Sequence, residues 1–286
     1  MPITYLKKAV PDKSTHQSSE EITATVKQIL SDVEIGKEEA VKNLAFKFDK
    51  WDGDIIVKRV EIDHAIEQVD AKVKADIMFA HANVKKFAEA QLATMKDTEI
   101  EVIPGLICGQ KNVPIKYAGC YIPGGRYCHI ASAIMTITTA KVAGVQHITC
   151  CHVPKAADGG IDPIMLYTMD LCGANTVMQI GGVQAIASLA YGLFGVPKAD
   201  IIVGPGNQYV AEAKRLLFGK LIGMDMVAGP TESMVIADET ADSDIVAADL
   251  IGQAEHGWNS PVWLLTDNEK LAIDVIAKAP LLIDTL

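Results

Sequence analysis

The chain has 286 residues, a formal net charge of −10 and a hydrophobic content of 49%. This length and composition predict a globular protein with a substantial core and two domains. The acidic balance argues against a nucleic-acid or anionic-membrane partner, because both need clustered Lys and Arg. No apolar stretch approaches the roughly 20 residues that span a bilayer, and the N-terminus lacks the apolar segment of a signal peptide.

The six cysteines include no Cys-x-x-Cys pair. This pattern favours reduced core thiols over disulfides or metal ligation. Together with the missing signal segment, it predicts a cytoplasmic protein with no membrane partner.

The N-terminal part of the chain has mainly helical periodicity. Apolar residues at helical spacing run from 19 to 48 with a break at Gly36, and predict a helical hairpin. A short strand is expected at 55–57, and helical spacing then resumes from 61 to 92.

Strand patterns begin near residue 99 and soon alternate with helices. Residues 99–122 contain β-branched runs broken at Pro104-Gly105, which predict two or three strands joined by tight turns. Four strand-helix units are then expected, at 118–122 with 131–143, 147–152 with 163–172, 176–180 with 183–193, and 199–203 with 208–218. Two further units are expected, at 233–237 with 245–256 and at 261–266 with a helix from Asn268 onward.

This alternation predicts an α/β protein built from two Rossmann-like parallel-sheet domains with an N-terminal helical segment. Residues 1–19 would form an N-terminal extension. Residues 20–120 together with 231–286 would form a first domain that is discontinuous and incomplete, and residues 121–230 would form the second.

Three of the strand-to-helix turns are rich in glycine: Tyr121–Gly125, Ile180–Gln184 and Val203–Asn207. In a parallel sheet such turns lie at the carboxyl ends of strands, where helix N-termini favour anionic groups. A dinucleotide fits such a crevice. None of the turns matches Gly-x-Gly-x-x-Gly, however, and glycine is also the usual residue of a tight turn, so the residues alone leave both roles open.

Two pairs of side chains are candidate ligand groups. Gln253 and His256 are three apart near the end of a predicted helix, so both project from one face and supply half of a metal site. The alternative is an ordinary helix C-terminus, where His interacts well with the dipole. Arg126 and His129 follow the first glycine-rich turn and suit an anionic substrate group, with a solvated loop as the alternative.

Five ordered motifs together carry a family resemblance. They are Tyr121-Ile122-Pro123-Gly124-Gly125, Gly181-Gly182-Val183-Gln184-Ala185-Ile186-Ala187, Gly204-Pro205-Gly206-Asn207 with Glu212-Ala213-Lys214-Arg215, Ala228-Gly229-Pro230-Thr231-Glu232, and Gln253-Ala254-Glu255-His256-Gly257. In order and spacing, along nearly the whole chain, they resemble the histidinol dehydrogenase family. The resemblance implies an NAD- and zinc-dependent homodimer that oxidises a primary alcohol through an aldehyde to a carboxylate, in two successive hydride transfers.

The resemblance also implies a role for particular residues. Residues 121–230 would be the NAD-binding domain, and the side chains expected to contact NAD are Tyr121, Gln184 and Asn207. Those expected to bind zinc and border the substrate are Gln253 and His256, while Thr231 would contact the substrate.

The resemblance places the other zinc ligands, an Asp and a His, and the Glu-His acid/base pair later than Leu286. No catalytic acid or base is therefore assigned within this chain. Two neutral ligands do not enclose or neutralise Zn²⁺, so we expect the 286-residue piece alone to bind zinc weakly and to be inactive.

The substrate is a separate question. Residues 124–132 and Pro261–Trp263 are similar to a branch of the family that oxidises 2,3-dihydroxypropane-1-sulfonate to sulfolactate, in which Arg126 and His129 would serve the sulfonate. The alternative substrate is L-histidinol, oxidised to L-histidine. The alternative of another class is a catalytically inactive fragment or a nucleotide-binding module.

Overall fold

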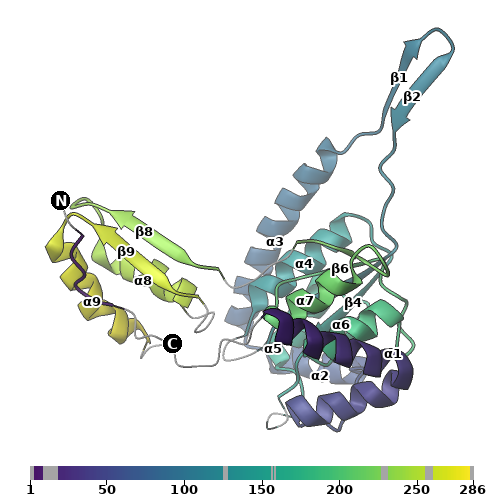
Figure 1. Cartoon of the computed structure of the whole chain (residues 1–286), viewed down its shortest axis with the longest axis horizontal. Helices are drawn as coiled ribbons and strands as arrows, with labels where there is room; N and C mark the ends of the chain where they lie inside the picture. The colour runs from purple at the N-terminus through teal and green to yellow at the C-terminus, as the bar shows by residue number, and fades with distance from the viewer. Residues whose placement is uncertain are drawn as a thin grey trace. The chain divides into compact units, whose positions relative to one another are not determined.

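The computed structural model describes residues 3–8, 19–124, 128–155, 157, 159–226, 231–254 and 260–283. The chain divides into two compact units, one spanning residues 18–228 and the other spanning 229–286 together with 1–17. Figure 1 shows the elements of both. The sequence predicted that residues 20–120 and 231–286 form one domain. The structure instead includes 20–120 in the same unit as 121–228, because the N-terminal helices pack on the sheet formed by that segment.

The larger unit begins with helices. The N-terminal helices are α1 (Ser19–Asp49), α2 (Arg59–Gln68) and α3 (Ala71–Thr94). The backbone of Lys37 leaves helical geometry, with φ 51° and ψ −134°, so α1 consists of two helices joined there (Figure 1). The expected hairpin is confirmed, with its break one residue after Gly36.

A five-stranded parallel sheet forms the centre of the larger unit, in the order β5-β4-β3-β6-β7. The strands are β3 (Tyr117–Ile122), β4 (His147–His152), β5 (Thr176–Gln179), β6 (Ile201–Val203) and β7 (Gly223–Met224). The helices between them are α4 (Ile130–Val142), α5 (Pro163–Cys172), α6 (Gly182–Tyr191) and α7 (Gln208–Leu217). The four expected strand-helix units are confirmed; the short strand β7 is additional.

The order of these strands reverses at the centre of the sheet. The chain enters at β3, moves outward to β5, and returns to β6 on the other side of β3. Ligands of doubly wound α/β proteins bind outside the carboxyl ends of the strands at this kind of reversal. Here that position lies between the ends of β3 and β6, where Cys120 pairs with Val203.

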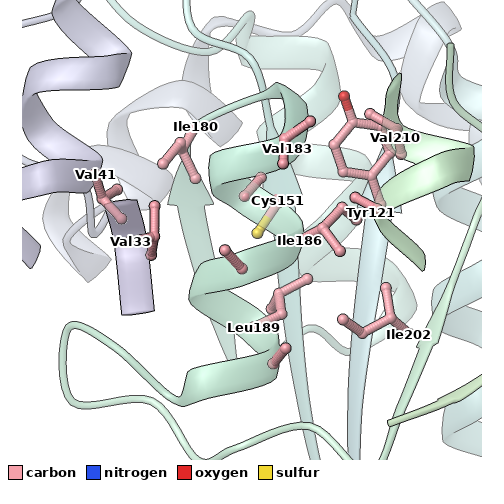
Figure 2. Packing of buried hydrophobic residues seen from close by; sticks show 14 of the residues in the cluster. Val33, Val41, Tyr121, Cys151, Ile180, Val183, Ile186, Leu189, Ile202 and Val210 are labelled. Atoms are coloured by element: carbon pink, nitrogen blue, oxygen red, sulfur yellow. The ribbon is translucent and has the colours of Figure 1, made fainter. Parts of the chain in front are cut away.

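Both faces of the sheet are covered, which explains why its strands are almost continuously apolar. One core cluster joins Tyr121, Cys151 and Ile202 to residues of α1, α6 and α7, as Figure 2 shows. The other cluster joins Cys120 and Cys150 to residues of α2, α3, α4 and α5. Cys120 and Cys150 directly precede Tyr121 and Cys151 in their strands, so their side chains lie on the opposite face of the sheet. All six cysteines are free.

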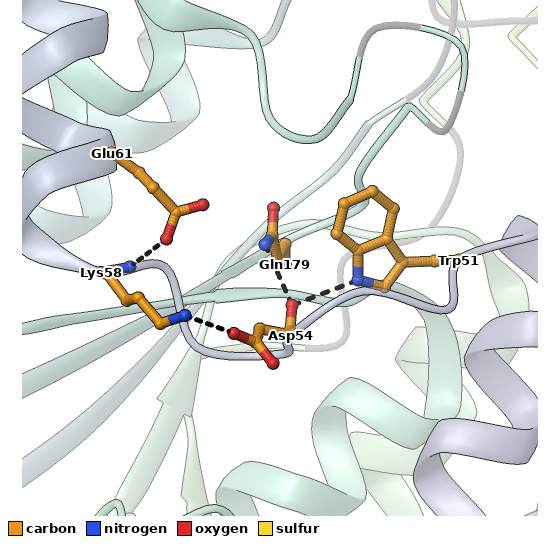
Figure 3. Close-up of polar contacts among 5 residues, drawn as sticks. All are labelled: Trp51, Asp54, Lys58, Glu61 and Gln179. Atoms are coloured by element: carbon orange, nitrogen blue, oxygen red, sulfur yellow. Dashed lines mark hydrogen bonds and ion pairs between the residues drawn. The ribbon is translucent and has the colours of Figure 1, made fainter.

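The segment before α2 closes the β5 edge of the sheet. Ile56 makes a single antiparallel bridge to Met178, where a short strand was expected. Beside it, the Asp54 carbonyl accepts hydrogen bonds from Gln179 Nε2 at 2.9 Å and from Trp51 Nε1 at 3.2 Å (Figure 3). The Asp54 carboxylate pairs with Lys58 Nζ at 2.7 Å. The edge strand is thereby paired and less open to association with another chain.

An antiparallel hairpin follows α3 and consists of β1 (Thr98–Ile103) and β2 (Leu106–Gln110). It turns at Gly105, whose φ is +84°, as the Pro104-Gly105 sequence predicts. Every residue of both strands is exposed, and within the larger unit the hairpin projects away from the sheet (Figure 1).

The smaller unit contains two parallel strands, β8 (Ser233–Ala237) and β9 (Val262–Thr266), with helices α8 (Ser243–Ala254) and α9 (Glu269–Ile283). Val246, Leu250, Leu271 and Val275 form its core against the strands. The expected α/β class is thus confirmed, with parallel strands in both units. None of the helices in the described ranges is long and apolar enough to cross a membrane.

Candidate nucleotide site

Tyr121 connects the glycine-rich turns at the carboxyl edge of the large sheet. Its side chain comes from the end of β3 and is only 5% exposed. The hydroxyl accepts a hydrogen bond from the Gly182 N–H at the start of α6, with an N···O distance of 3.2 Å. Burial raises the pKa of Tyr121 to about 12. The phenol therefore stays neutral near pH 7 and positions α6 rather than acting as a base.

The turn between β6 and α7 lies directly against the end of β3. At Gly204, φ is +113°, and a Cβ atom would stand 2.0 Å from the Tyr121 carbonyl oxygen. At Gly206, a Cβ atom would stand 2.4 Å from Val210 Cγ1 and 3.3 Å from the Tyr121 ring. A side chain at Gly204 would push the turn away from the strand, and one at Gly206 would displace Val210 of α7.

Asn207 starts α7. Its Oδ1 atom accepts hydrogen bonds from the backbone N–H groups of Tyr209 at 3.0 Å and Val210 at 3.1 Å. This is an N-cap, which satisfies two of the donors that a helix start otherwise leaves unpaired. The cap uses the oxygen of the side chain and leaves the Nδ2 group of an exposed residue for a ligand.

Gln184 lies in the first turn of α6 and is only 2% exposed. Its Nε2 atom donates to Asp49 Oδ2 at a distance of 3.4 Å, and burial raises the pKa of the Asp49 carboxyl. Asp49 ends α1 and escaped the sequence analysis. The only sequence signal was a polar residue at the end of a helical pattern.

Of the three side chains expected to contact NAD, Asn207 is exposed, while Tyr121 and Gln184 are buried behind the turns. Tyr121 contacts the start of α6, which carries Gln184, and the turn that carries Asn207. Two helices of ten residues each, α6 and α7, begin at this edge of the sheet. Their partly positive N-termini favour an anionic group such as a pyrophosphate. The residues present thus fit a dinucleotide.

A pair of histidines flanks the turn between β3 and α4. His129 precedes α4 as its N-cap residue, while Arg126 lies outside the described residues. His152, at the end of β4, is 7% exposed, and its Nδ1 lies 3.1 Å from the Ile122 carbonyl oxygen. Burial lowers the pKa of His152 to about 4; nearby His129 contributes to the shift. His152 is therefore neutral near pH 7 and braces the end of β3.

The smaller unit contains the candidate metal and substrate residues. Gln253 Nε2 donates to the Thr231 carbonyl oxygen at 3.1 Å, so the structure joins these two predicted residues. His256 lies outside the described residues. Within the described part of the chain no three His, Cys, Asp or Glu side chains form a metal-binding group. Gln253 is thus the one predicted zinc ligand that is described, and an amide oxygen alone does not hold zinc.

The strand order and the turns of the larger unit define a doubly wound α/β protein. Comparison with known proteins specifies the family, because residues 12–286 match the model described as histidinol dehydrogenase. The chain belongs to the histidinol dehydrogenase family, as its five motifs indicated.

Individual relatives and a solved structure agree with this family. The chain is 55% identical to the sulfopropanediol 3-dehydrogenase of Ruegeria pomeroyi over 98% of its own length and 63% of the relative's. It is 52% identical to a histidinol dehydrogenase homolog of Pelagibacter ubique, over 100% of its length and 66% of the relative's. The crystal structure of the Elizabethkingia anophelis histidinol dehydrogenase superposes with a TM-score of 0.83 at 37% identity, covering 95% of this chain and 62% of that one. The chain thus spans less than two thirds of each of these proteins.

Proposed function

We propose that this chain contributes the dinucleotide site and part of the metal site of an NAD- and zinc-dependent dehydrogenase, which oxidises a primary alcohol to a carboxylate. The observation that carries the proposal is the contact of Tyr121 with the start of α6 and with the β6–α7 turn, at the strand-order reversal of the sheet. The family membership of the chain supports it.

Each side chain has a physical role in this proposal. Tyr121 and the two glycines of the β6–α7 turn set the spacing between the starts of α6 and α7, where the pyrophosphate would lie. Asn207 would donate its amide to the dinucleotide, and Gln253 with His256 would hold zinc. When bound, NAD would accept hydride, and zinc would lower the pKa of the substrate hydroxyl.

For the substrate we propose 2,3-dihydroxypropane-1-sulfonate, oxidised to sulfolactate. The support is the 55% identity with a sulfopropanediol 3-dehydrogenase, against 37% with the Elizabethkingia anophelis histidinol dehydrogenase. A sulfonate needs cationic or N–H partners, which Arg126 and His129 would supply. L-Histidinol remains the second candidate, supported by the same family membership.

Two features support proposals for the cellular compartment and the oligomeric state. Exposed free thiols at Cys108 and Cys128 suit a reducing compartment, so we place the enzyme in the cytoplasm. The projecting hairpin β1–β2 carries exposed apolar residues that a second copy of the chain would cover, so we propose a homodimer.

Binding of NADH to the 286-residue chain tests the dinucleotide site. Asn207→Ala should weaken binding about tenfold or more, because an amide donor for the ligand and the cap of α7 are lost together. Gln184→Ala should also weaken binding, because the hydrogen bond between Asp49 and the first turn of α6 is lost. Gln28→Ala and Asn112→Ala, which change the same residue types far from the site, should bind normally. No binding by the unmodified chain would refute the site.

A test of the substrate needs a protein as long as the relatives. A chimera completed with the remainder of the Ruegeria pomeroyi relative should turn over dihydroxypropanesulfonate faster than histidinol. Arg126→Ala should reduce turnover of the sulfonate selectively. Equal losses on both substrates would reject the sulfonate role of Arg126, and no NAD reduction with either substrate would favour the alternative of an inactive nucleotide-binding module.

A further inference from the structure

An ion pair between a buried lysine and a partly exposed aspartate holds the turn between β6 and α7. Lys214, on α7, is only 1% exposed, and its Nζ lies 2.6 Å from Asp225 Oδ1. The same Nζ donates to the Gly204 carbonyl oxygen at 2.8 Å. Asp225, which follows β7, accepts from the Gly204 N–H through Oδ2, also at 2.8 Å. Both polar groups of one glycine backbone are thus bound by two opposite charges, an arrangement we call the Gly204 clamp.

Packing alone does not account for a buried lysine at this position. Burying an ammonium group is costly even when it is paired, and an apolar side chain of similar size often stabilises a fold equally well. What a buried ion pair does provide is a single defined geometry. In this chain that geometry is imposed on Gly204, whose φ of +113° and contact with Tyr121 already restrict the turn.

The clamp also decides which groups the turn offers to a ligand. The Gly204 N–H donates to Asp225, and the N–H groups of Tyr209 and Val210 donate to Asn207. The backbone donors left in the turn and the first helical residue are those of Gly206, Asn207 and Gln208. Gly204 lies three residues before Asn207, so the clamp fixes where this short group of donors stands relative to β3.

We propose that Lys214 and Asp225 are positioning residues for the dinucleotide, holding the β6–α7 turn in its binding geometry. The inference rests on the proposed function, since it assigns the turn to NAD. Neither residue need touch the ligand. The clamp holds only the β6–α7 turn. It should therefore support binding of the mononucleotide half of NAD that contacts this turn, and not binding of the other half.

NADH titration of the whole 286-residue chain tests the proposal. Lys214→Met keeps the length of the side chain but removes its charge, and should weaken NADH binding at least tenfold. Lys214→Arg should restore part of the affinity. The matched control is Arg215→Met, which breaks the ion pair of the exposed Arg215 with Glu212 on the same helix and should leave affinity unchanged. If Lys214→Met fails to fold, Asp225→Asn, which retains an acceptor for the Gly204 N–H, replaces it.

Binding of AMP and of nicotinamide mononucleotide, measured separately by ligand-observed NMR, distinguishes positioning from general destabilisation. In Lys214→Met, one of these two mononucleotides should bind more weakly, and the other should bind as it does to the unmodified chain. Equal loss of both halves, or unchanged NADH affinity in a folded variant, would overturn the clamp proposal and leave the dinucleotide site standing. Absence of NADH binding by the unmodified chain would overturn both.

Discussion

Several polar side chains at the carboxyl edge of the sheet contact neighbouring backbone groups and hold them in place. The Tyr121 hydroxyl holds the start of α6, Asn207 caps α7, and His152 lies against the Ile122 carbonyl. Each group is uncharged in this role: Asn207 carries no ionisable group, and burial disfavours ionisation of the phenol and the imidazole. Polar side chains that hold turns in this way preorganise a site before any ligand arrives.

His152 gives a prediction for the dependence of stability on pH. Burial lowers its pKa from 6.5 to about 4; His129 and Lys155 also lower it, while the Ile122 carbonyl and Asp162 oppose the shift. Because the unfolded chain binds the proton more readily, stability is fully present above pH 6.5 and falls as the pH drops toward 4. The loss from this group should be about 3 kcal/mol.

Urea unfolding between pH 7 and pH 4 measures this effect. The decline in unfolding free energy should be smaller in His152→Gln than in the unmodified chain. Parallel profiles for His152→Gln and the unmodified chain would show that the imidazole does not resist protonation in the fold.

At the scale of elements, the β6–α7 turn depends on close approach of backbone to backbone. Gly204→Ala would put a methyl group 2.0 Å from the Tyr121 carbonyl oxygen. We expect a loss on the order of 3–5 kcal/mol, because neither backbone segment can move without disturbing the sheet. Gly144→Ala, where φ is +80° but nothing lies within 4 Å, should cost only about 1 kcal/mol. Similar losses for both in thermal unfolding would contradict the close approach.

The hairpin β1–β2 carries exposed apolar side chains on both of its strands. A two-stranded hairpin is marginally stable by itself in water, yet Ile100 and Ile107 here are 61% and 62% exposed. If a second copy covers it, the double substitution Ile100→Lys with Ile107→Lys should weaken dimerisation at least tenfold in sedimentation analysis. Ile35→Lys, at an exposed site on α1, should have no effect. A monomeric unmodified chain would contradict the proposed dimer.

For the whole molecule, the ligand set limits what the chain can do with a metal. Gln253 and His256 are both neutral, and the described residues contain no group of three His, Cys, Asp or Glu that would bind a metal. We therefore expect zinc to be removed by dialysis and NAD-dependent alcohol oxidation to be absent from the 286-residue chain. Stoichiometric zinc after dialysis, measured by metal analysis, would show that further ligands are present.

The sequence by itself determined the class of fold, the glycine-rich turns and the family. Strand-helix alternation and five ordered motifs are local properties of the chain, so they can be read without coordinates. The family resemblance also predicted that Tyr121, Gln184 and Asn207 contact NAD, and these roles stay predictions.

Only the tertiary structure decided how distant segments meet. The position of α1 on the sheet, the bond between Asp49 and Gln184, and the clamp of Lys214 and Asp225 on Gly204 join residues from different elements. Local periodicity carries no information about such contacts, because they depend on the order in which parallel strands assemble. For the same reason the sequence assigned residues 20–120 to the wrong compact unit: their helical pattern shows an apolar face, but not which sheet that face covers.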